Sequence, residues 1–380
     1  MELSDRIPQT LARLQETGCC RALRETVPDR DGVNLSGNDY LGITADAALR
    51  EEFFRQYAGN FGSRELALSG TSSRLLTGNS PAYTRLEEKL SSLYDGRAAL
   101  VFNSGYHANI GILPALSGKG DLILADKLDH ASIIDGLRLC GADFLRFRHL
   151  ACDHLEELLE SRRDKYRNVF IVTESIFSMD GDEADLRRLA ELKKRFDCFL
   201  IVDEAHGAGV RGPRGQGLAA ECGVSESVDI LIGTFGKALG STGAYAVMAP
   251  EMREYLINRM RPFIFTTALP PVILNWSAFV LEKVPGMTDR REKLRRMGIR
   301  LRERLRAVDP GRTIPGVSQI VPWIAGGERE AAELAERLGK HGFLVFPIRP
   351  PTVPKGTARL RFSLSADLEE AVVDELADCL

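Results

Sequence analysis

The residues best suited to chemistry are a lysine and an aspartate that each follow an apolar run. Lys237 lies in TFGKALG (234–240), between glycines that allow a backbone and a ligand to approach closely. Asp203, thirty-four residues earlier, lies near the end of the apolar run CFLIVDEA (198–205). Ligands of open α/β sheets bind at the carboxyl ends of strands, so we expect both side chains to face one crevice. A lysine without such a partner is usually a surface residue.

This pair has the two groups that pyridoxal phosphate chemistry requires. A lysine amine forms a Schiff base with the cofactor, and a buried carboxylate keeps the pyridine nitrogen protonated so that the ring takes up electrons. His206 could donate to the phenolic oxygen of the ring, and His130 could stack on its face, although each is also compatible with a structural role. The sequence therefore predicts a pyridoxal phosphate enzyme that uses Lys237 and Asp203.

Two nucleotide-binding motifs occur beside these residues, and both are rejected. HGAGVRG (206–212) contains G-x-G-x-x-G after a strand, but PRGQG (213–217) continues as a loop where a dinucleotide site needs a helix N-terminus. DEAH (203–206) matches a helicase box, but the sequence has no G-x-x-x-x-G-K-[ST] to hold a triphosphate. Neither a nicotinamide enzyme nor a helicase is expected.

The elements that must position these residues follow an α/β pattern. Apolar runs alternate with amphipathic segments from about residue 97, and a continuous apolar run predicts a strand that is buried on both faces. The predicted strands of a mostly parallel sheet are 98–102, 122–125, 169–174, 198–205 and 230–234. Ser80 as a cap and Pro81 at the first helical position predict a helix that ends near Tyr94.

The pattern changes after Pro270 and Pro271 to a long charged helix predicted over 281–308. The elements predicted after it are a strand (318–324), a helix (328–340), two strands (343–347 and 358–364) and a helix (367–379). We therefore expect an N-terminal segment (1–45), a large cofactor-binding domain (46–270), and linker helices with a small C-terminal α+β domain (271–380).

Composition excludes several functional classes. The 380 residues carry 50 basic and 53 acidic side chains, so no strong field draws the chain to nucleic acid or to anionic lipid. Seven cysteines, an odd number without C-x-x-C spacing, predict reduced thiols in the cytosol and no zinc site. No secretory signal is recognisable, and no apolar run approaches the ~18 residues of a membrane span. We expect a cytoplasmic enzyme with a small-molecule substrate and no metal.

The motifs around these residues resemble those of the α-oxoamine synthases, which are fold type I pyridoxal phosphate enzymes. The resemblance spans nearly the whole chain, and so many motifs in the same order are highly specific. The matching stretches are SGNDYLG (36–42), SSRLLTGN (72–79), NSGYHAN (103–109), ESIFSMDGD (174–182), VDEAHGAGVRGPRGQG (202–217), TFGKALGSTGA (234–244), FTTALPP (265–271) and IRPPTVPKGTARLRFSLSA (348–366). One departure is the stretch 61–79, where the family pattern is a shorter loop rich in glycine and serine.

The resemblance implies roles for individual residues. Lys237 would carry the cofactor, Asp203 would pair with the pyridinium nitrogen, His130 would stack on the ring and contact the substrate, and His206 would contact the phenolic oxygen. Further cofactor contacts implied by the resemblance are Gly105, Tyr106, Ser178 and Thr234, with Thr266 or Thr267 reaching the phosphate of the neighbouring subunit in a homodimer. Residues implied for the substrates are Arg361 and Asn38 at the amino acid carboxylate, and Arg21 and Thr352 at the acyl donor.

The resemblance also implies a reaction, the decarboxylative condensation of L-alanine with a pimeloyl thioester of coenzyme A or acyl carrier protein in biotin biosynthesis. Sister enzymes join glycine to acetyl-CoA or succinyl-CoA, or serine to palmitoyl-CoA, with the same catalytic centre. The segment RPPTVP (349–354) favours the alanine enzyme, because the sister enzymes usually lack its Arg-Pro-Pro start. A binding protein that kept the fold without the chemistry is disfavoured by the intact catalytic residues.

Overall fold

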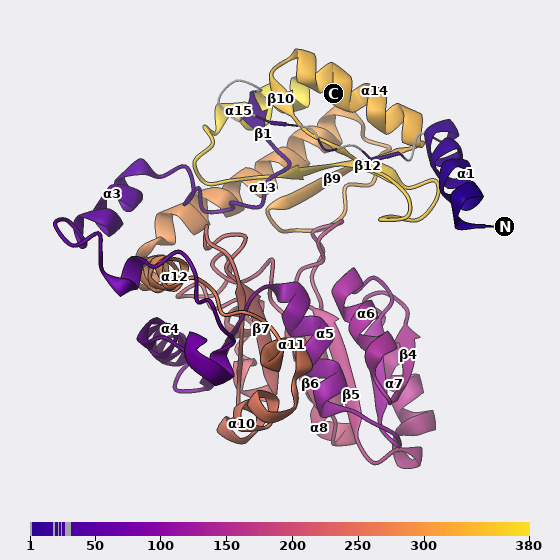
Figure 1. Ribbon diagram of the computed structural model, residues 1–380. Helices are drawn as coiled ribbons and strands as arrows, with labels where there is room; N and C mark the ends of the chain where they lie inside the picture. Colours follow the sequence, from indigo (N-terminus) through magenta and orange to yellow (C-terminus); the bar gives the residue numbers. More distant parts are fainter. Residues whose placement is uncertain (1, 18–19, 22, 24, 27–31) are drawn as a thin grey trace. The chain divides into compact units, whose positions relative to one another are not determined.

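The computed structural model describes residues 2–17, 20–21, 23, 25–26 and 32–380 (Figure 1). The chain forms two compact units. The larger contains Asp39–Ser178 and Glu183–Glu292, and the smaller contains Met1–Asn38, Met179–Asp182 and Lys293–Leu380. These bounds differ from those of the domains expected above, which stay a prediction.

A seven-stranded sheet forms the centre of the larger unit. Its strands in chain order are β2 (Ala98–Phe102), β3 (Leu122–Asp126), β4 (Asp143–Phe147), β5 (Val169–Glu174), β6 (Phe199–Asp203), β7 (Ile230–Thr234) and β8 (Ala244–Met248). The spatial order is β2-β8-β7-β6-β5-β3-β4, and β8 alone runs antiparallel to its neighbours. The carboxyl ends of β3, β5, β6 and β7 therefore lie along one edge of the sheet.

All five predicted strands of this sheet are confirmed, and two strands were missed. The edge strand β4 is largely exposed and carries Asp143 and Arg146, so it lacks a continuous apolar run. The antiparallel strand β8 is fully buried, but its sequence AYAVM is rich in alanine, which has a low strand propensity.

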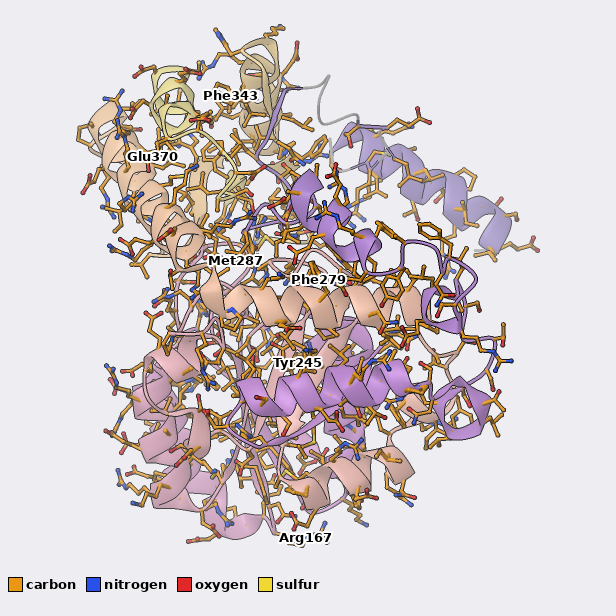
Figure 2. All side chains as sticks on the ribbon, turned by 90° about the vertical axis from the view of Figure 1, so that its left-hand side faces the viewer. Arg167, Tyr245, Phe279, Met287, Phe343 and Glu370 are labelled. Carbon is orange, nitrogen blue, oxygen red and sulfur yellow. The ribbon has the colours of Figure 1, made fainter. Side chains whose placement is uncertain are left out.

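Helices cover both faces of this sheet. The α-helices that lie wholly within the larger unit are α3 (Ala47–Arg55), α4 (Pro81–Leu93), α5 (Gly105–Leu116), α6 (Ala131–Leu139), α7 (Cys152–Arg162), α8 (Leu186–Phe196), α9 (Leu218–Glu221), α10 (Pro250–Arg259), α11 (Arg261–Ile264) and α12 (Pro271–Lys283). Helix α5 packs on α6 and α7 packs on α8, whereas α4 and α12 lie side by side (Figures 1 and 2). The connections β2–α5–β3 and β3–α6–β4 cross the sheet toward the edge strand β4, whereas β4–α7–β5 and β5–α8–β6 cross it in the opposite direction. Because such crossovers are right-handed, α5 and α6 lie on one face of the sheet and α7 and α8 lie on the other.

The predicted start of α4 is half correct. Pro81 occupies the first turn as expected. Ser80 precedes it, but its side chain makes no capping hydrogen bond, and its buried Oγ has no partner among the residues that the structure describes. Pro81 alone therefore accounts for the start of α4 at this position.

The smaller unit contains short strands and helices. These are α1 (Leu3–Glu16), β1 (Val33–Asn34), β9 (Ile320–Gly326), α14 (Glu328–Lys340), β10 (Phe343–Leu344), β11 (Pro347–Ile348), β12 (Ala358–Ser363) and α15 (Ala371–Asp378). Strands β11, β12 and β9 form an antiparallel sheet, while β1 and β10 form a separate parallel pair. The helix over 328–340 is confirmed with its predicted bounds.

Two predictions in this part of the chain were wrong. The helix expected over 281–308 is divided, because Val284–Gly286 forms a 3₁₀ turn between α12 and α13 (Thr288–Val308). Pro285 has no backbone N–H, so it cannot donate the hydrogen bond that would continue α12. The single strand expected over 343–347 is instead β10 and β11, which belong to different sheets. In the described part of the chain, no helix is long and apolar enough to cross a membrane.

Candidate active site

Lys237 lies in a tightly held loop directly after β7. Its Nζ is 2.8 Å from Nε2 of His206. Its own carbonyl accepts from the N–H of Gly240, which has a φ of +54° and lies so close to Ile43 that a Cβ would come within 2.6 Å of that side chain. Only glycine fits both the backbone angle and the space, so the loop geometry that aims Lys237 depends on Gly240.

His206 connects Lys237 to a buried tyrosine. Its Nδ1 is 2.6 Å from the hydroxyl of Tyr40, which has no exposed surface. When the ammonium of Lys237 donates to Nε2, Nδ1 carries the proton and donates to the tyrosine oxygen. Tyr40 lies in the motif SGNDYLG, and no role for it was predicted.

Asp203 is the last residue of β6 and is 6 % exposed. Its Oδ2 accepts from Nδ2 of Asn109 at 2.8 Å, and its Oδ1 accepts from the N–H of Ala205 at 2.9 Å. These donors offset the cost of removing a carboxylate from water. The carboxylate is thus held in one orientation at the edge of the sheet.

His130 is the residue that precedes helix α6. Its Nδ1 is 2.7 Å from Oγ of Ser132 and accepts from the N–H of the same residue. Partial burial lowers the pKa of His130 below its usual 6.5, with Asp203 opposing this change and the charge of Lys237 adding to it. The lowered pKa favours the neutral ring, which is the state that suits stacking on an aromatic cofactor.

Glu174 is a member of this cluster that sequence reasoning missed. It ends β5, lies opposite Asp203 in the parallel register, and is 3 % exposed. Burial, reinforced by the charge of Asp203, raises the pKa of Glu174 to about 8, although Lys237 and the N–H of His130 act in the other direction. Its Oε1 has no hydrogen-bond partner among the described residues. The signal for it was present in ESIFSMDGD, from which only Ser178 was assigned.

The other predicted cofactor residues occur in the larger unit as well. Gly105 begins α5, behind Ser104, whose Oγ accepts from the N–H of His107. The N–H groups of a helix's first turn favour an anion such as a phosphate. Tyr106 is exposed and donates to Asp135 at 2.6 Å, which directs its hydroxyl toward α6.

Four further predicted hydroxyl residues differ in their surroundings. Thr234 ends β7 and donates to the carbonyl of Gly243, while Ser178 is partly exposed. Thr266 is partly exposed and its Oγ1 accepts from Asn103 at 3.3 Å, whereas Thr267 is exposed and uses its carbonyl for the same asparagine. The side chain of Thr267 thus remains at the surface, as the prediction of a contact with a second subunit requires.

Four of the five predicted substrate residues form two contacts within the smaller unit, and the fifth, His130, belongs to the larger unit. Nη2 of Arg361 donates to Oδ1 of Asn38 at 3.1 Å, and the arginine is only 7 % exposed although it lies on β12. Nη2 of Arg21 donates to Oγ1 of Thr352 at 3.1 Å. The structure therefore brings together each pair that was assigned to a common substrate.

The rejected nucleotide motifs have a structural explanation. Glu204 is buried, and its carboxylate accepts from Ser175 and from the N–H groups of Leu218 and Ala219 at the start of α9. A Cβ at Gly207 would come within 2.1 Å of that carboxylate, and one at Gly217 within 2.5 Å. These glycines make room for a buried glutamate, not for a pyrophosphate.

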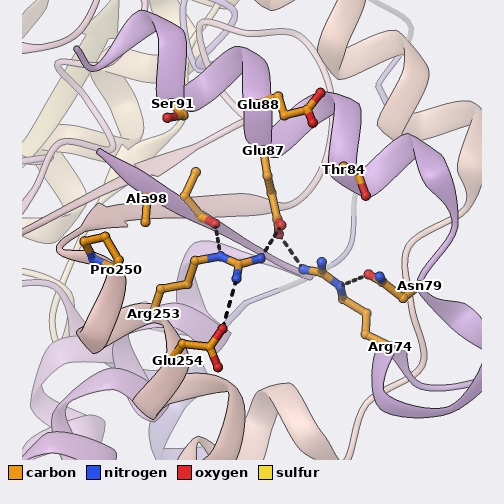
Figure 3. A pocket seen from close by; sticks show the side chains of 11 residues that line it. Arg74, Asn79, Thr84, Glu87, Glu88, Ser91, Ala98, Pro250, Arg253 and Glu254 are labelled. Atoms are coloured by element: carbon orange, nitrogen blue, oxygen red, sulfur yellow. Dashed lines mark hydrogen bonds and ion pairs between the residues drawn. The ribbon is translucent and has the colours of Figure 1, made fainter. Parts of the chain in front are cut away.

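A second polar cluster lines a pocket formed by α4, β2 and α10 (Figure 3). Glu87 binds Arg74 at 2.7 Å and Arg253 at 2.9 Å, and it also accepts from the N–H of Val101. Arg74 stacks on the ring of Tyr83 with 3.8 Å between the guanidinium carbon and the ring centroid. None of the predicted site residues belongs to this cluster, which joins the segment 74–79 to the sheet.

The residues at or just after the carboxyl ends of β3, β5, β6 and β7 fit pyridoxal phosphate. An amine, a buried carboxylate and two histidines converge there, and a helix N-terminus with Gly105 could receive the phosphate. The buried Oε1 of Glu174, unpaired among the described residues, is a further polar atom on which a bound group could act.

Comparison with known proteins identifies the family. The family model for class I and II aminotransferases matches residues 30–380. An 8-amino-7-oxononanoate synthase from Chlorobaculum parvum is 54% identical over 375 residues, which are 99% of this chain and 95% of that one. A structure of SPT with pyridoxal phosphate matches 100% of this chain and 98% of its own, with a TM-score of 0.88 at 28% identity. An 8-amino-7-oxononanoate synthase structure from Francisella tularensis matches 92% of this chain and 97% of its own, with a TM-score of 0.76 at 28% identity. The chain belongs to the class I and II aminotransferase family and, within it, to the 8-amino-7-oxononanoate synthases of the α-oxoamine synthase group.

Proposed function

We propose that this protein condenses L-alanine with a pimeloyl thioester and releases CO2, the free thiol and 8-amino-7-oxononanoate, with pyridoxal phosphate as cofactor. The observation that carries the proposal is the cluster of Lys237, His206 and Asp203 at the ends of adjacent parallel strands. The 54% identity over nearly the whole chain supports this substrate pair. We place the reaction in the cytosol, in line with the free thiols of the described cysteines.

The residues of the larger unit would divide the chemical work. Pyridoxal phosphate, when bound, acts as the electron sink that makes the α-carbon of alanine acidic and then accepts the electrons released with CO2. Lys237 holds the cofactor and, once displaced by alanine, removes the proton from the alanine α-carbon. Asp203 keeps the pyridine nitrogen protonated, and the neutral ring of His130 covers the cofactor face.

The residues of the smaller unit would bind the substrates. Arg361 is proposed to hold the alanine carboxylate, because its guanidinium is kept in place by Asn38 and forms paired hydrogen bonds that a lysine cannot. A fixed carboxylate decides which bond to the α-carbon is aligned with the π system of the cofactor. Arg21 and Thr352 are proposed contacts of the acyl donor.

The second candidate is a sister condensation, for which the structural likeness to SPT is the specific observation. Its TM-score of 0.88 exceeds the 0.76 of the Francisella tularensis synthase, although both are 28% identical. Backbone likeness therefore does not separate the acyl donors, since the family members share one scaffold. Sequence identity of 54% is the stronger criterion because it compares side chains, which a backbone superposition does not.

We propose further that the protein is a homodimer with shared active sites. Large apolar side chains are exposed in the segment 61–76 and in the segment that begins at residue 265. Their exposed fractions are 67% for Phe61, 83% for Leu68, 78% for Leu76 and 71% for Phe265. The two segments are adjacent in the larger unit, because the N–H of Ala268 donates to the carbonyl of Ser72. An apolar surface of this kind is typical of an interface. The exposed Thr267 lies beside it, where a second subunit's cofactor phosphate could be reached.

The test is a substrate matrix with purified protein and pyridoxal phosphate. L-Alanine, glycine and L-serine are each combined with pimeloyl, acetyl, succinyl and palmitoyl thioesters, on coenzyme A and on acyl carrier protein, while thiol release is followed. We expect turnover with alanine and a pimeloyl donor. Turnover with glycine and acetyl-CoA but not with that pair would assign the protein to the sister reaction, and sedimentation of the same sample as a monomer would contradict the dimer.

A further inference from the structure

We propose that Asn109 is a positioning residue that fixes two cofactor-binding groups at once, the carboxylate of Asp203 and the imidazole of His130. This inference deepens the proposed function and rests on it, because the roles of both groups come from there. Asn109 lies on α5 in the motif NSGYHAN, where no role was assigned to it.

A continuous chain of hydrogen bonds links the two groups. Nδ2 of Asn109 lies 2.8 Å from Oδ2 of Asp203 and 3.0 Å from Oγ of Ser132. Oγ of Ser132 lies 2.7 Å from Nδ1 of His130. Asn109 is 3 % exposed, Ser132 is 1 % exposed and Asp203 is 6 % exposed, so the two hydrogen bonds that Asn109 donates are shielded from water.

The direction of each bond follows from the chemistry of its atoms. The carboxylate of Asp203 can only accept, so the amide nitrogen of Asn109 must face it, and its second hydrogen is directed to Ser132. Because Oγ of Ser132 accepts from Asn109, its own hydrogen is free to donate to Nδ1 of His130. The N–H of Ser132 donates to the same nitrogen. Nδ1 thus carries no proton, and the neutral imidazole of His130 keeps its proton on Nε2.

The backbone around Asn109 is fixed by helix packing. Gly136 of α6 lies so close that a Cβ there would come within 2.6 Å of the carbonyl oxygen of Asn109. Helices α5 and α6, which carry Asn109 and Ser132, therefore approach at a distance that only glycine allows. The position of the amide is determined by this contact and not by a flexible loop.

Loss of the amide would act on both ends of the chain. Asp203 would lose one of the donors that orient its carboxylate, and Ser132 would lose the bond that directs its hydroxyl toward His130. A nearly isosteric variant, Asn109→Leu, removes both hydrogens while keeping the side chain's volume. Asn258→Leu is the matched control, because Asn258 lies exposed on α10 and donates to the carbonyl of Glu254.

The first measurement is the affinity for pyridoxal phosphate, followed by its visible absorption during dialysis. A hydrogen bond to a charged group is typically worth about 10- to 100-fold in an equilibrium constant, so we expect Asn109→Leu to bind the cofactor at least about 10-fold more weakly. The control variant should bind as the parent protein does. An affinity within about twofold of the parent would overturn the role at Asp203.

The second measurement reports the tautomer of His130 in the cofactor-free protein. Imidazole nitrogen chemical shifts are recorded by NMR, and the signals are assigned by their loss in His130→Gln. The parent should show the tautomer with the proton on Nε2. Ser132→Ala leaves the N–H of residue 132, at 3.2 Å, as the remaining donor of this chain to Nδ1, so it should show a larger share of the other tautomer than the parent does. Asn109→Leu should show a smaller change in the same direction. An unchanged tautomer in both variants would overturn the proposed chain, and Ser132→Ala keeps this test available if Asn109→Leu does not fold.

These two measurements also separate this inference from the proposed function. If the parent protein failed to bind pyridoxal phosphate, the proposed function would fall while the tautomer would still test the hydrogen-bond chain. If the cofactor bound and neither variant changed its affinity or the tautomer, the function would stand and Asn109 would have only a packing role.

Discussion

Glu174 provides the sharpest test of the electrostatics of the site. Its carboxyl is buried at the end of β5, where the charges of Asp203 and Asp126 oppose its ionisation while Lys237 and the N–H of His130 favour it. Asp129 also faces it, and burial raises the pKa of that carboxyl too, with Asp126 and Glu174 contributing. Glu174→Gln keeps the shape and removes the charge, so it isolates the cost of ionising this position.

The sign of the effect follows from proton binding. The pKa of Glu174 is about 8 in the folded protein against an ordinary 4.5, so the folded state binds more protons between these two values. The free energy of unfolding therefore falls as pH rises through this window. The difference between 4.5 and about 8 corresponds to about 5 kcal/mol, and the unpaired amide hydrogens of a glutamine offset about 1–3 kcal/mol of it. We expect Glu174→Gln to be more stable than the parent by about 2–4 kcal/mol above pH 8 and not more stable near pH 4.5.

Thermal unfolding of the cofactor-free protein, followed by circular dichroism at both pH values, checks this expectation. Glu204→Gln is the matched control, because Glu204 is equally buried but accepts three hydrogen bonds from Ser175, Leu218 and Ala219. That variant presents amide hydrogens to donors and should lose about 1–3 kcal/mol. The reasoning is refuted if Glu174→Gln has the same midpoint as the parent at alkaline pH, or if both variants shift in the same direction.

Three further predictions concern the rest of the chain. Lys237→Ala should bind pyridoxal phosphate weakly yet show no exchange of the alanine α-proton by NMR, while Lys340→Ala exchanges normally; preserved exchange in the first variant would contradict the role of the amine. Arg361→Lys should reduce kcat/KM for alanine by about 10- to 100-fold in steady-state assays, since paired hydrogen bonds to a carboxylate are lost, and an unchanged value would remove Arg361 from the substrate site. Glu87→Gln should destabilise the protein by about 3 kcal/mol in thermal unfolding, because Arg74 and Arg253 lose their shared charge partner (Figure 3). Glu88→Gln, which changes the exposed neighbour, should have little effect. Equal effects of the two variants would show that the ion pairs of Glu87 do not stabilise the fold.

The strands of the central sheet were predictable where burial on both faces produces continuous apolar runs. Strand β4 was not, because an edge position lets Asp143 and Arg146 face solvent and removes the apolar pattern. Pro285 indicates a break in the helix predicted over 281–308, but charged residues before and after the proline gave the whole segment the pattern of one helix. The division of 343–347 between two sheets depends on which distant strand each half pairs with, and no local pattern carries that information.

The candidate site shows the same distinction. Lys237 and Asp203 were identified because their side-chain chemistry and their places after apolar runs are local properties of the sequence. Tyr40, Asn109, Ser132 and Glu174 were missed because each is an ordinary polar residue until folding buries it against a site residue.

The sequence by itself therefore determined the fold class, the family and the cofactor lysine, since these depend on residue types and their spacing along the chain. Only the tertiary structure decided which groups surround Lys237 and Asp203 and which protonation states those groups favour. The physical reason is that hydrogen-bond direction and burial arise between residues far apart in the chain, as with the 94 positions that separate Asn109 from Asp203.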